Sequence, residues 1–372
     1  MGMSLIEGNE AVAYGALAAG CRFFAGYPIT PATTILNTML SLLPPAGGIC
    51  LQGEDEIASI GYCLGASMTG MKAMTATSGP GISLYSEHIS FAIGSEIPIV
   101  IVNVQRLGPS TGSATRGADG DINFMRWGSS SGLPVIVLAP VDVGDCYSLT
   151  MQAFNLAETY RCPVFLASNK EIGMTRESID LAAVEQPPVF NRTMATDSEH
   201  FLPFQIKNGQ SVPYFLPIGD NVPVRQTSST HGIDGYITTN TDEIASFQQR
   251  LYDKLQTTVD RYSYHEIGGQ DASTLLITYG VTAQAAKTAV RVCNRLGAPV
   301  SLLVLKTLWP VPESLIRRTA REAKRVVVLE MNLGQYVNEI RRILPGKTID
   351  FYGQMDGRLI TPGQIEEVIT RG

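Results

Sequence analysis

The chain has 372 residues, more than one hydrophobic core usually organises, so two domains with connecting structure are expected. The formal net charge is −6, and no Lys/Arg cluster interleaved with aromatic residues is present, so a nucleic-acid partner is not expected. No apolar run is long enough to cross a bilayer, and residues 1–10 lack the basic start of a secretory signal, so we expect a cytoplasmic protein without a membrane role.

The cysteines favour reduced thiols over metal binding. Six are present, without a C-x-x-C pair and without the spacing that holds zinc or an iron–sulfur cluster. They are Cys21, Cys50, Cys63, Cys146, Cys162 and Cys293. Any metal used in electron transfer is therefore expected on another chain.

In the first half of the chain, short β-branched runs alternate with amphipathic stretches, which predicts a parallel sheet covered by helices. The expected strands are residues 22–27, 49–52, 72–77, 97–105, 135–139 and 164–167. The alternation resumes with expected strands at 274–279, 300–305, 325–330 and 348–352, and helices at 282–294, 313–323 and 333–343. This second pattern predicts a smaller α/β domain.

The segment between these two patterns is rich in Pro, Gly, Asn and Ser. Residues 183–240 show no sustained period, whereas residues 242–260 have helical spacing. So long an irregular stretch is expected to wrap a partner or to be partly disordered. The predicted division is a first domain at 1–185, a connecting segment at 186–270 and a second domain at 271–372.

Polar or glycine-rich residues follow four of the expected strands. These tails are residues 27–31, 52–56, 77–81 and 105–106. Ligands of open parallel sheets bind beyond the carboxyl ends of the strands, where loops and helix amino-termini meet. The four tails are therefore the candidate site.

The first two tails carry Thr30 and Glu56. Thr30 followed by Pro31 matches a helix N-cap with proline at the first helical position, and spacing alone supports a simple cap and a carboxylate-binding helix start equally. Glu54, Asp55 and Glu56 open the next expected helix, where acidic residues often only complement the helix dipole. Glu56 could instead be desolvated beside an apolar helix face and serve in proton transfer.

The other two tails carry Gly79 and Arg106. Residues 78–81 form a strand-to-helix turn that lets the backbone approach a ligand, although a tight turn alone explains the glycines. Arg106 ends a very apolar strand and needs an anionic partner. That partner is either an internal acid or a substrate carboxylate, which the guanidinium fits with two hydrogen bonds.

Five ordered segments resemble the alpha subunit of the 2-oxoacid:ferredoxin oxidoreductases, and within that family the 2-oxoglutarate type. They are residues 26–31, 52–60, 76–84, 102–112 and 330–335, and residues 202–204 and 230–232 of the connecting segment add to them. The resemblance implies an α/β fold with a thiamine-diphosphate-enzyme pyrimidine-binding domain followed by a transketolase-C-like domain.

The resemblance also implies a cofactor shared between subunits. This chain would hold the aminopyrimidine of thiamine diphosphate, while a beta subunit would hold the diphosphate, Mg²⁺ and a [4Fe-4S] cluster. Ferredoxin, coenzyme A and a heterotetramer of two alpha and two beta chains are implied as well. Gamma or delta subunits are further candidate partners, because no coenzyme A or ferredoxin-like domain is fused here.

Residue roles follow from the matched positions. Glu56 falls at the glutamate that binds N1′ of the aminopyrimidine, with Pro28 and Gly79 in the cofactor-binding segments. Thr30 and Arg106 fall at positions that contact the oxoacid carboxylate. The implied reaction is oxidative decarboxylation of a 2-oxoacid, 2-oxoglutarate to succinyl-CoA, or its reverse.

Two loops and one acidic motif leave alternatives open. Residues 129–132 and 113–119 depart from the usual family pattern, so a branched-chain or aryl 2-oxoacid is an alternative substrate. Asp119-Gly120-Asp121 is similar to the motif that binds magnesium diphosphate, but no apolar strand precedes it and no Asn pair follows, so no metal site is predicted. A subunit of a non-redox thiamine enzyme, or a nucleotide-binding or scaffold protein with this fold, remains a further alternative.

Overall fold

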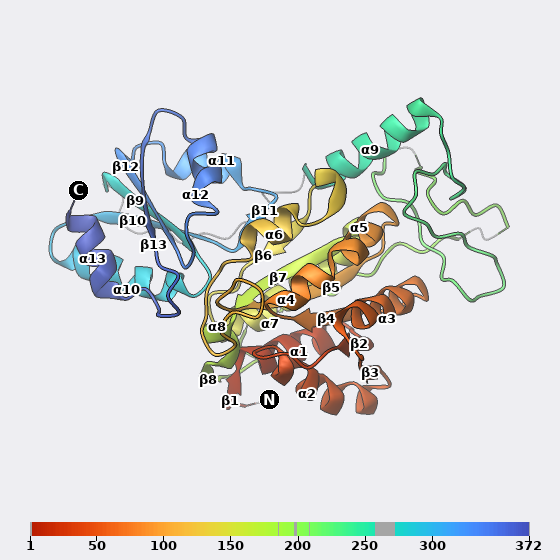
Figure 1. Ribbon diagram of the computed structural model, residues 1–372, viewed down its shortest axis with the longest axis horizontal. Coiled ribbons are helices and arrows are strands. Elements are labelled where there is room, and N and C mark those ends of the chain that lie inside the picture. The colour runs from red at the N-terminus through yellow and green to blue at the C-terminus, as the bar shows by residue number, and fades with distance from the viewer. Residues whose placement is uncertain (1, 185, 197–198, 208, 257–271, 372) are drawn as a thin grey trace.

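The computed structural model describes residues 2–184, 186–196, 199–207, 209–256 and 272–371. Within them lie a seven-stranded sheet, a four-stranded sheet and a two-stranded sheet. Figure 1 shows the four-stranded sheet and its helices on the left, the larger sheet at the centre, and the connecting segment with α9 at the upper right. No helix in these ranges is long and apolar enough to cross a membrane.

The seven-stranded sheet forms the first domain. In order across the sheet, its strands are β11 (Thr307–Trp309), β6 (Ile136–Leu138), β7 (Pro163–Asn169), β5 (Ile99–Gln105), β4 (Ala73–Thr77), β2 (Phe23–Gly26) and β3 (Ile49–Gln52). All pairs are parallel except β11 with β6. Parallel strands covered on both faces read as continuous apolar runs, and β5 is buried along its whole length.

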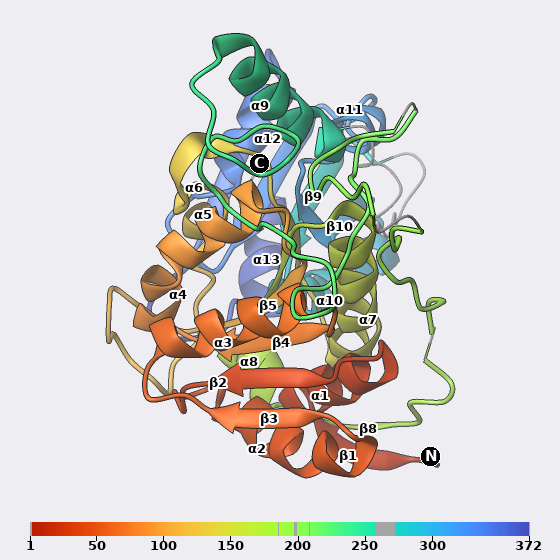
Figure 2. The same ribbon diagram turned by 90° about the vertical axis from the view of Figure 1, so that its right-hand side faces the viewer.

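Helices cover both faces of this sheet (Figure 2). The helices α1 (Gly8–Ala18), α2 (Thr33–Leu42) and α7 (Val143–Tyr160) pack on one face, and α3 (Glu56–Met68) and α5 (Ser86–Gly94) on the other. Along β5, Ile99 and Ile101 join the α3 side, whereas Val100 and Val102 join the α1 side. Successive side chains of a strand point to opposite faces, so one apolar run supplies both cores.

Smaller elements complete the first domain. They are β1 (Ser4–Glu7), which pairs with β8 (Arg176–Ile179), and α4 (Pro80–Leu84), α6 (Ile122–Trp127), α8 (Lys170–Met174) and two short 3₁₀ turns at Pro44–Ala46 and Ser130–Gly132. The elements β1, α1 and β8 were not among those expected from the sequence.

The four-stranded sheet forms the second domain and is entirely parallel. Its strands are β10 (Val300–Leu305), β9 (Thr274–Tyr279), β12 (Arg325–Glu330) and β13 (Thr348–Gly353). Its helices are α10 (Thr282–Arg295), α11 (Glu313–Thr319), α12 (Val337–Ile343) and α13 (Pro362–Thr370). The expected strands 274–279, 300–305 and 325–330 have the observed bounds, whereas the helix expected at 333–343 begins only at Val337.

Strand β11 joins the two domains. It follows β10 in the chain but pairs with β6 of the first sheet, placing Thr307 opposite Leu138 and Trp309 opposite Val137. One continuous cluster of buried side chains runs from the α3 side of the first sheet through Trp309 to Tyr336 of the second domain. A three-residue strand is too short to show a period, which is why the sequence did not predict this crossing. The division at 185 and 271 stays a prediction.

The connecting segment packs against the first domain. Its described residues within 183–240 form only turns, bends and isolated bridges, and α9 (Thr241–Gln256) follows. Arg192 forms a buried ion pair with Glu158 at 2.6 Å, and Lys254 forms one with Glu96 at 2.9 Å. The expected helix thus begins near residue 242, and its predicted end at 257–260 lies outside the described residues.

Candidate active site

The four polar tails lie side by side at one edge of the first sheet. Strands β5, β4, β2 and β3 are consecutive neighbours, so their carboxyl ends meet. The Gly53 N–H donates to the Gly26 carbonyl at 3.0 Å, which holds the tail of β3 against that of β2. The structure therefore brings together the regions that the sequence singled out.

Glu56 is the first residue of α3. Asp55 is the N-cap, because its carboxylate accepts a hydrogen bond from the Ala58 N–H at 2.7 Å. Glu56 is 7% exposed, and no hydrogen bond or ion pair reaches its carboxylate from the described part of the chain. A buried carboxylate without a donor is costly, so this group is suited to a ligand that donates a hydrogen bond.

The turn after β4 contacts both Glu56 and Arg106 because it contains glycines. A Cβ atom on Gly81 would overlap Thr77 Oγ1 and lie 2.9 Å from Glu56 Oε1. A Cβ atom on Gly79, whose φ is +52°, would lie 2.6 Å from Arg106 Nε. A side chain at Gly79 would displace the guanidinium, and one at Gly81 would displace the carboxylate.

Arg106 links the tails of β5 and β2. Its Nη1 donates to the Thr30 carbonyl at 2.5 Å and its Nη2 to the Thr111 carbonyl at 2.9 Å. Its Nε is buried without an acceptor, and no carboxylate of the described residues forms an ion pair with it. Burial lowers the pKa of Arg106, and the nearby charges of Asp121 and Glu56 partly offset that effect. The guanidinium is thus a buried cation that still has hydrogen-bonding capacity for an anion.

The prediction that Thr30 caps a helix is wrong. Helix α2 begins at Thr33, and its N-cap is Ala32. The carbonyls before it are already used, since Thr30 O accepts from Arg106 and Pro31 O accepts from Asn9 Nδ2 at 2.8 Å. These bonds hold residues 30–32 in a turn, so Thr30 is at the site as an exposed residue of that turn.

Several buried polar atoms around these strand ends have no hydrogen-bond partner. They are Asn9 Oδ1, Thr77 Oγ1, Ser78 Oγ, Asn103 Oδ1, Arg106 Nε, Asp119 Oδ2 and Ser168 Oγ. Buried polar groups are nearly always paired, so such a cluster indicates that a polar ligand or ordered water completes it. Hydrophobic periodicity could not have revealed Asn9, because it stands beside Glu10 at the start of α1, where polar residues are common.

The acidic motif lies at the junction of the domains. Asp119 Oδ1 accepts from Asn169 Nδ2 at 2.9 Å, and Asp121 Oδ2 accepts from Asn103 Nδ2 at 3.0 Å. Within the described ranges, no group of three or more His, Cys, Asp or Glu residues is placed to hold a metal ion. Asn103 and Asn169 donate to these carboxylates.

The two divergent loops differ in their distance from Arg106. The Leu107 N–H donates to Arg116 O at 2.8 Å, so residues 113–119 fold back directly beside Arg106. In contrast, Ser130 N donates to Ser90 Oγ at 3.0 Å, and Arg126 Nη1 donates to Leu133 O at 3.1 Å. Residues 129–132 therefore pack on α5 and α6.

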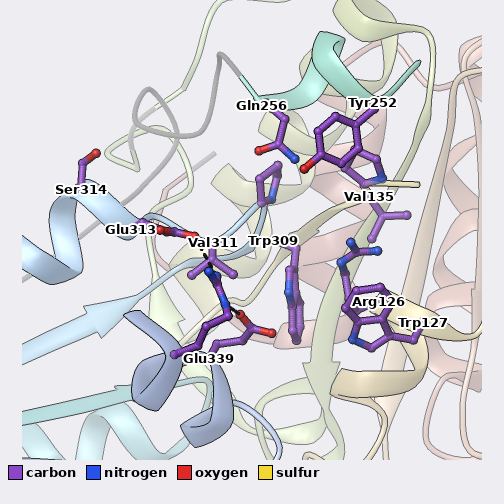
Figure 3. Close-up of a pocket in the computed structure, with 13 residues that line it drawn as sticks. Arg126, Trp127, Val135, Tyr252, Gln256, Trp309, Val311, Glu313, Ser314 and Glu339 are labelled. Carbon is purple, nitrogen blue, oxygen red and sulfur yellow. Dashed lines mark hydrogen bonds and ion pairs between the residues drawn. The ribbon is translucent and has the colours of Figure 1, made fainter. Parts of the chain in front are cut away.

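A cavity of about 520 Å³ lies where α6, α9, β11, α11 and α12 meet (Figure 3). Its walls include Arg126, Trp127, Tyr252 and Trp309. The Arg126 guanidinium stacks 3.7 Å above the Trp127 ring. The tails of β2, β3, β4 and β5 do not line this cavity, so it is separate from the candidate active site.

Comparison with known proteins agrees with this geometry. Residues 14–231 match the family described as pyruvate flavodoxin/ferredoxin oxidoreductase, thiamine diphosphate-binding. Residues 272–365 match core domain II of pyruvate:ferredoxin oxidoreductase. The chain belongs to the 2-oxoacid:ferredoxin oxidoreductase family. The expected fold, a thiamine-diphosphate-binding α/β domain followed by a smaller α/β domain, is confirmed.

The matches to individual relatives cover almost the whole chain. The 2-oxoglutarate synthase subunit KorA of Methanothermobacter thermautotrophicus is 39% identical, and the match covers 98% of each chain. The ketoisovalerate oxidoreductase subunit VorB of the same organism is 32% identical over 99% of this chain and 97% of that subunit. Both relatives are named as subunits, which implies that they work in complexes with other subunits.

Solved structures give the same result. The 2-oxoglutarate:ferredoxin oxidoreductase of Magnetococcus marinus, with 2-oxoglutarate, coenzyme A and succinyl-CoA bound, superimposes with a TM-score of 0.93 at 32% identity. The match covers 99% of this chain and 65% of that one. A split-gene transketolase matches with a TM-score of 0.58 at 11% identity, which is a likeness of fold alone.

Proposed function

We propose that this chain is the aminopyrimidine-binding subunit of a 2-oxoglutarate:ferredoxin oxidoreductase. The observation that carries the proposal is the buried Glu56 carboxylate, which has no donor among the described residues and stands against the glycine turn at Gly81. Arg106 lies at the same sheet edge as an unpaired cation. One edge thus offers an acceptor for a cofactor and a cation for a substrate.

The residues fit the aminopyrimidine of thiamine diphosphate. Glu56 would accept a hydrogen bond from N1′, and the glycines at 79 and 81 let Arg106 and Glu56 pack directly against the turn beside it. Pro28, in the tail of β2, would border the same space. When bound, this cofactor supplies the carbanion chemistry by which 2-oxoacids are decarboxylated.

Arg106 would bind the oxoacid carboxylate, and Thr30 would lie beside it. The Thr30 carbonyl orients the guanidinium through the 2.5 Å hydrogen bond. A carboxylate would take up the hydrogen-bonding capacity that the two carbonyl contacts leave, and charge-assisted bonds of this kind are short and strong. The substrate is then held at the edge where the cofactor reacts.

The rest of the machinery would come from other chains. We place the diphosphate, Mg²⁺ and a [4Fe-4S] cluster on a beta subunit, in a heterotetramer of two alpha and two beta chains that passes electrons to ferredoxin and an acyl group to coenzyme A. Gamma or delta subunits would complete the assembly. The six cysteines are all unbridged, which suits a reducing compartment such as the cytoplasm.

Glu56→Gln in the complex purified with its partners tests the proposal. The amide keeps the shape but favours a different proton arrangement at N1′, so we expect oxoacid-dependent reduction of a low-potential dye to fall at least about 100-fold. Glu54→Gln, on the exposed residue two positions earlier, is the matched control and should keep full activity. Near-normal turnover of the Glu56 variant, with assembly intact, would overturn the assignment.

A branched-chain 2-oxoacid is the second candidate substrate. Two observations favour it. The divergent residues 113–119 lie beside Arg106, and a ketoisovalerate oxidoreductase subunit is among the relatives. Dye reduction with 2-oxoglutarate, 2-oxoisovalerate and an aryl pyruvate, each with coenzyme A, separates the substrates. A preference of at least tenfold for 2-oxoisovalerate would replace the 2-oxoglutarate assignment.

A further inference from the structure

The turn after β12 holds the second domain against the candidate active site. Asn332 Nδ2 donates to the Asp119 carbonyl at 2.9 Å, and Gln335 Nε2 donates to the Gly120 carbonyl at 2.5 Å. In return, the Asn123 N–H donates to Gln335 Oε1 at 2.7 Å, and the Asp119 N–H donates to Met331 O at 2.9 Å. These four bonds connect residues 119–123 of the first domain to the turn 331–335 of the second.

This turn is itself rigid. Glu330 is buried, and its carboxylate accepts from the Tyr279 hydroxyl at 2.8 Å and from the Tyr336 and Val337 N–H groups at 2.9 and 2.8 Å. Asn332 Oδ1 accepts from the Gly334 and Gln335 N–H groups at 2.9 and 3.1 Å. Because its acceptors and donors are paired within the second domain, the turn is a fixed platform for residues 119–123.

The Asp119 side chain completes the connection on the first-domain side. It is 3% exposed, and its Oδ1 accepts from Asn169 Nδ2, at the end of β7. The second oxygen, Oδ2, has no hydrogen-bond partner and faces Gly280, where a Cβ atom would stand 3.3 Å away. Asp119 therefore touches the end of a strand of each domain.

Asp121, two residues further on, reaches the strand that ends in Arg106. Its N–H donates to Gln105 Oε1 at 3.0 Å, and its carboxylate accepts from Asn103 Nδ2 at 3.0 Å. Its charge also acts on the Arg106 guanidinium, because it partly offsets the effect of burial, which lowers the pKa of that group. A displacement of residues 119–121 would therefore be transmitted to Arg106 through the side chains of β5.

We propose that Asp119 is a positioning residue for Arg106, and that the second domain, through Asn332 and Gln335, fixes the orientation of the substrate-binding guanidinium. This inference rests on the proposed function, in which Arg106 binds the oxoacid carboxylate. It assigns a task to the segment 330–335, which the resemblance singled out but to which it gave no role.

The charges around Asp119 favour its neutral form. The pKa of Asp119 is raised to about 7. Burial is the main cause, the acidic groups of Glu330 and Asp121 add to it, and the hydrogen bond from Asn169 partly opposes it. The other ionisable group against it is Tyr279, whose pKa burial also raises. Ionisation of Asp119 would place an unpaired charge beside two other carboxylates and would loosen the contact between the domains.

Steady-state kinetics of the assembled complex test the inference. For Asp119→Ala and Gln335→Ala we expect the KM for the oxoacid to rise about tenfold, with kcat reduced less than about threefold and the KM for coenzyme A unchanged. Asp253→Ala, at an exposed position of α9, is the matched control and should alter neither constant. A general loss of structure would instead lower kcat and raise the KM values for the oxoacid and coenzyme A together.

Asp119→Asn supplies a pH readout that a purely structural role would not move. In the natural protein the oxoacid KM should rise as the pH increases through about 7, as Asp119 ionises. In Asp119→Asn, which is neutral at every pH and keeps the oxygen that accepts from Asn169, this rise should be absent. If the pH profiles coincide, or if Asp119→Ala and Gln335→Ala leave the oxoacid KM unchanged, the inference is wrong.

Arg106→Lys separates failure of the inference from failure of the proposed function. If Arg106→Lys raises the oxoacid KM while the Asp119 and Gln335 variants do not, only the positioning role of Asp119 fails. If Arg106→Lys also leaves the oxoacid KM unchanged, the substrate-binding role of Arg106 fails with it. Should Asp119→Ala not assemble, Asp119→Asn and Gln335→Ala carry the test.

Discussion

A Cβ atom on Gly81 would stand 2.9 Å from Oε1 of Glu56, so the glycine and the carboxylate are in direct contact across the ends of two strands. The two residues belong to the tails of β3 and β4, which are separated in the sheet by β2. Their contact leaves the carboxylate buried but without a donor in the part of the chain that the structure describes. A small change at Gly81 is therefore transmitted directly to Glu56.

Gly81→Ala should impair the use of the cofactor. The new methyl group would overlap Thr77 Oγ1 and press on Glu56, and overpacking of this kind costs about 1–3 kcal/mol. We expect the concentration of thiamine diphosphate that gives half-maximal activity of the complex to rise at least about tenfold.

Gly363→Ala is the matched control for that substitution. Gly363 lies in α13 of the second domain, and nothing stands within 4 Å of the position that its Cβ would take. The complex with Gly363→Ala should have the same activity and the same dependence on thiamine diphosphate as the unmodified complex. Equal behaviour of the two variants would show that the Gly81 contact has no bearing on the cofactor.

The stability with which the connecting segment packs on the first domain should depend on the ion pair between Glu158 and Arg192. Both side chains are at most 4% exposed, and two bonds of 2.6 and 2.9 Å join them. Removal of one partner leaves a buried charge without compensation, which costs about 3–5 kcal/mol. Glu158→Ala should lower the free energy of unfolding by about that amount in chemical denaturation.

An exposed ion pair provides the comparison for Glu158. Glu367 and Arg371 pair at 2.8 Å on α13, with side chains 64% and 76% exposed. Exposed pairs of this type contribute about 0–1 kcal/mol, so Glu367→Ala should change stability little. Similar losses for Glu158→Ala and Glu367→Ala would contradict the role given to the buried pair.

Glu96 should make the fold sensitive to acid. Burial alone would raise the pKa of its carboxyl, but Lys254, Arg250 and Arg161 outweigh that effect and hold the pKa at about 2. Since this value lies below the ordinary one of 4.5, the stabilisation is complete above about pH 4.5 and is lost as the pH falls toward 2. The Tm deficit of Glu96→Gln, measured from pH 7 to pH 3, should therefore shrink as the pH falls.

The contribution of Asp119 to stability should have the opposite pH dependence to that of Glu96. Its pKa is raised from 3.8 to about 7, so the folded state binds an additional proton between these values, and stability falls as the pH rises across them. Asp119→Asn removes this dependence. The Tm of Asp119→Asn should gain on that of the natural protein between pH 4 and pH 7, and a constant difference would contradict a raised pKa.

The polar strand ends could be predicted because their signal is local. A parallel strand that is buried on both faces has an apolar run with a clear end, and the buried strands β9, β10 and β12 have the bounds that the sequence predicted. The exposed edge strand β3 also has its predicted bounds. Residues directly after such an end must lie at the sheet edge. This reasoning placed Glu56, Gly79 and Arg106 at one edge before their contacts were known.

Other parts of the site could not be predicted, because their signal is distant in the chain. Asn9 bonds to Pro31, 22 residues away, and Asn332 bonds to Asp119, 213 residues away. A polar residue in an isolated helix or turn looks the same whether it is solvated or buried against such a partner. The expectation that Thr30 caps a helix failed for the same reason, since its carbonyl accepts a hydrogen bond from Arg106, 76 residues further along, and α2 begins only at Thr33. Its contact with the oxoacid carboxylate stays a prediction.

The amino-acid sequence by itself determined the α/β class, the strand ends that carry the site and the family. These follow from periodicity and from short motifs, which depend on neighbouring residues only. The tertiary structure decided that β11 joins the first sheet, that the turn after β12 is bonded to residues 119–123, and that Glu56 has no donor among the described residues. Such facts depend on which distant groups share a buried space, and burial decides whether a polar group is paired or left for a ligand.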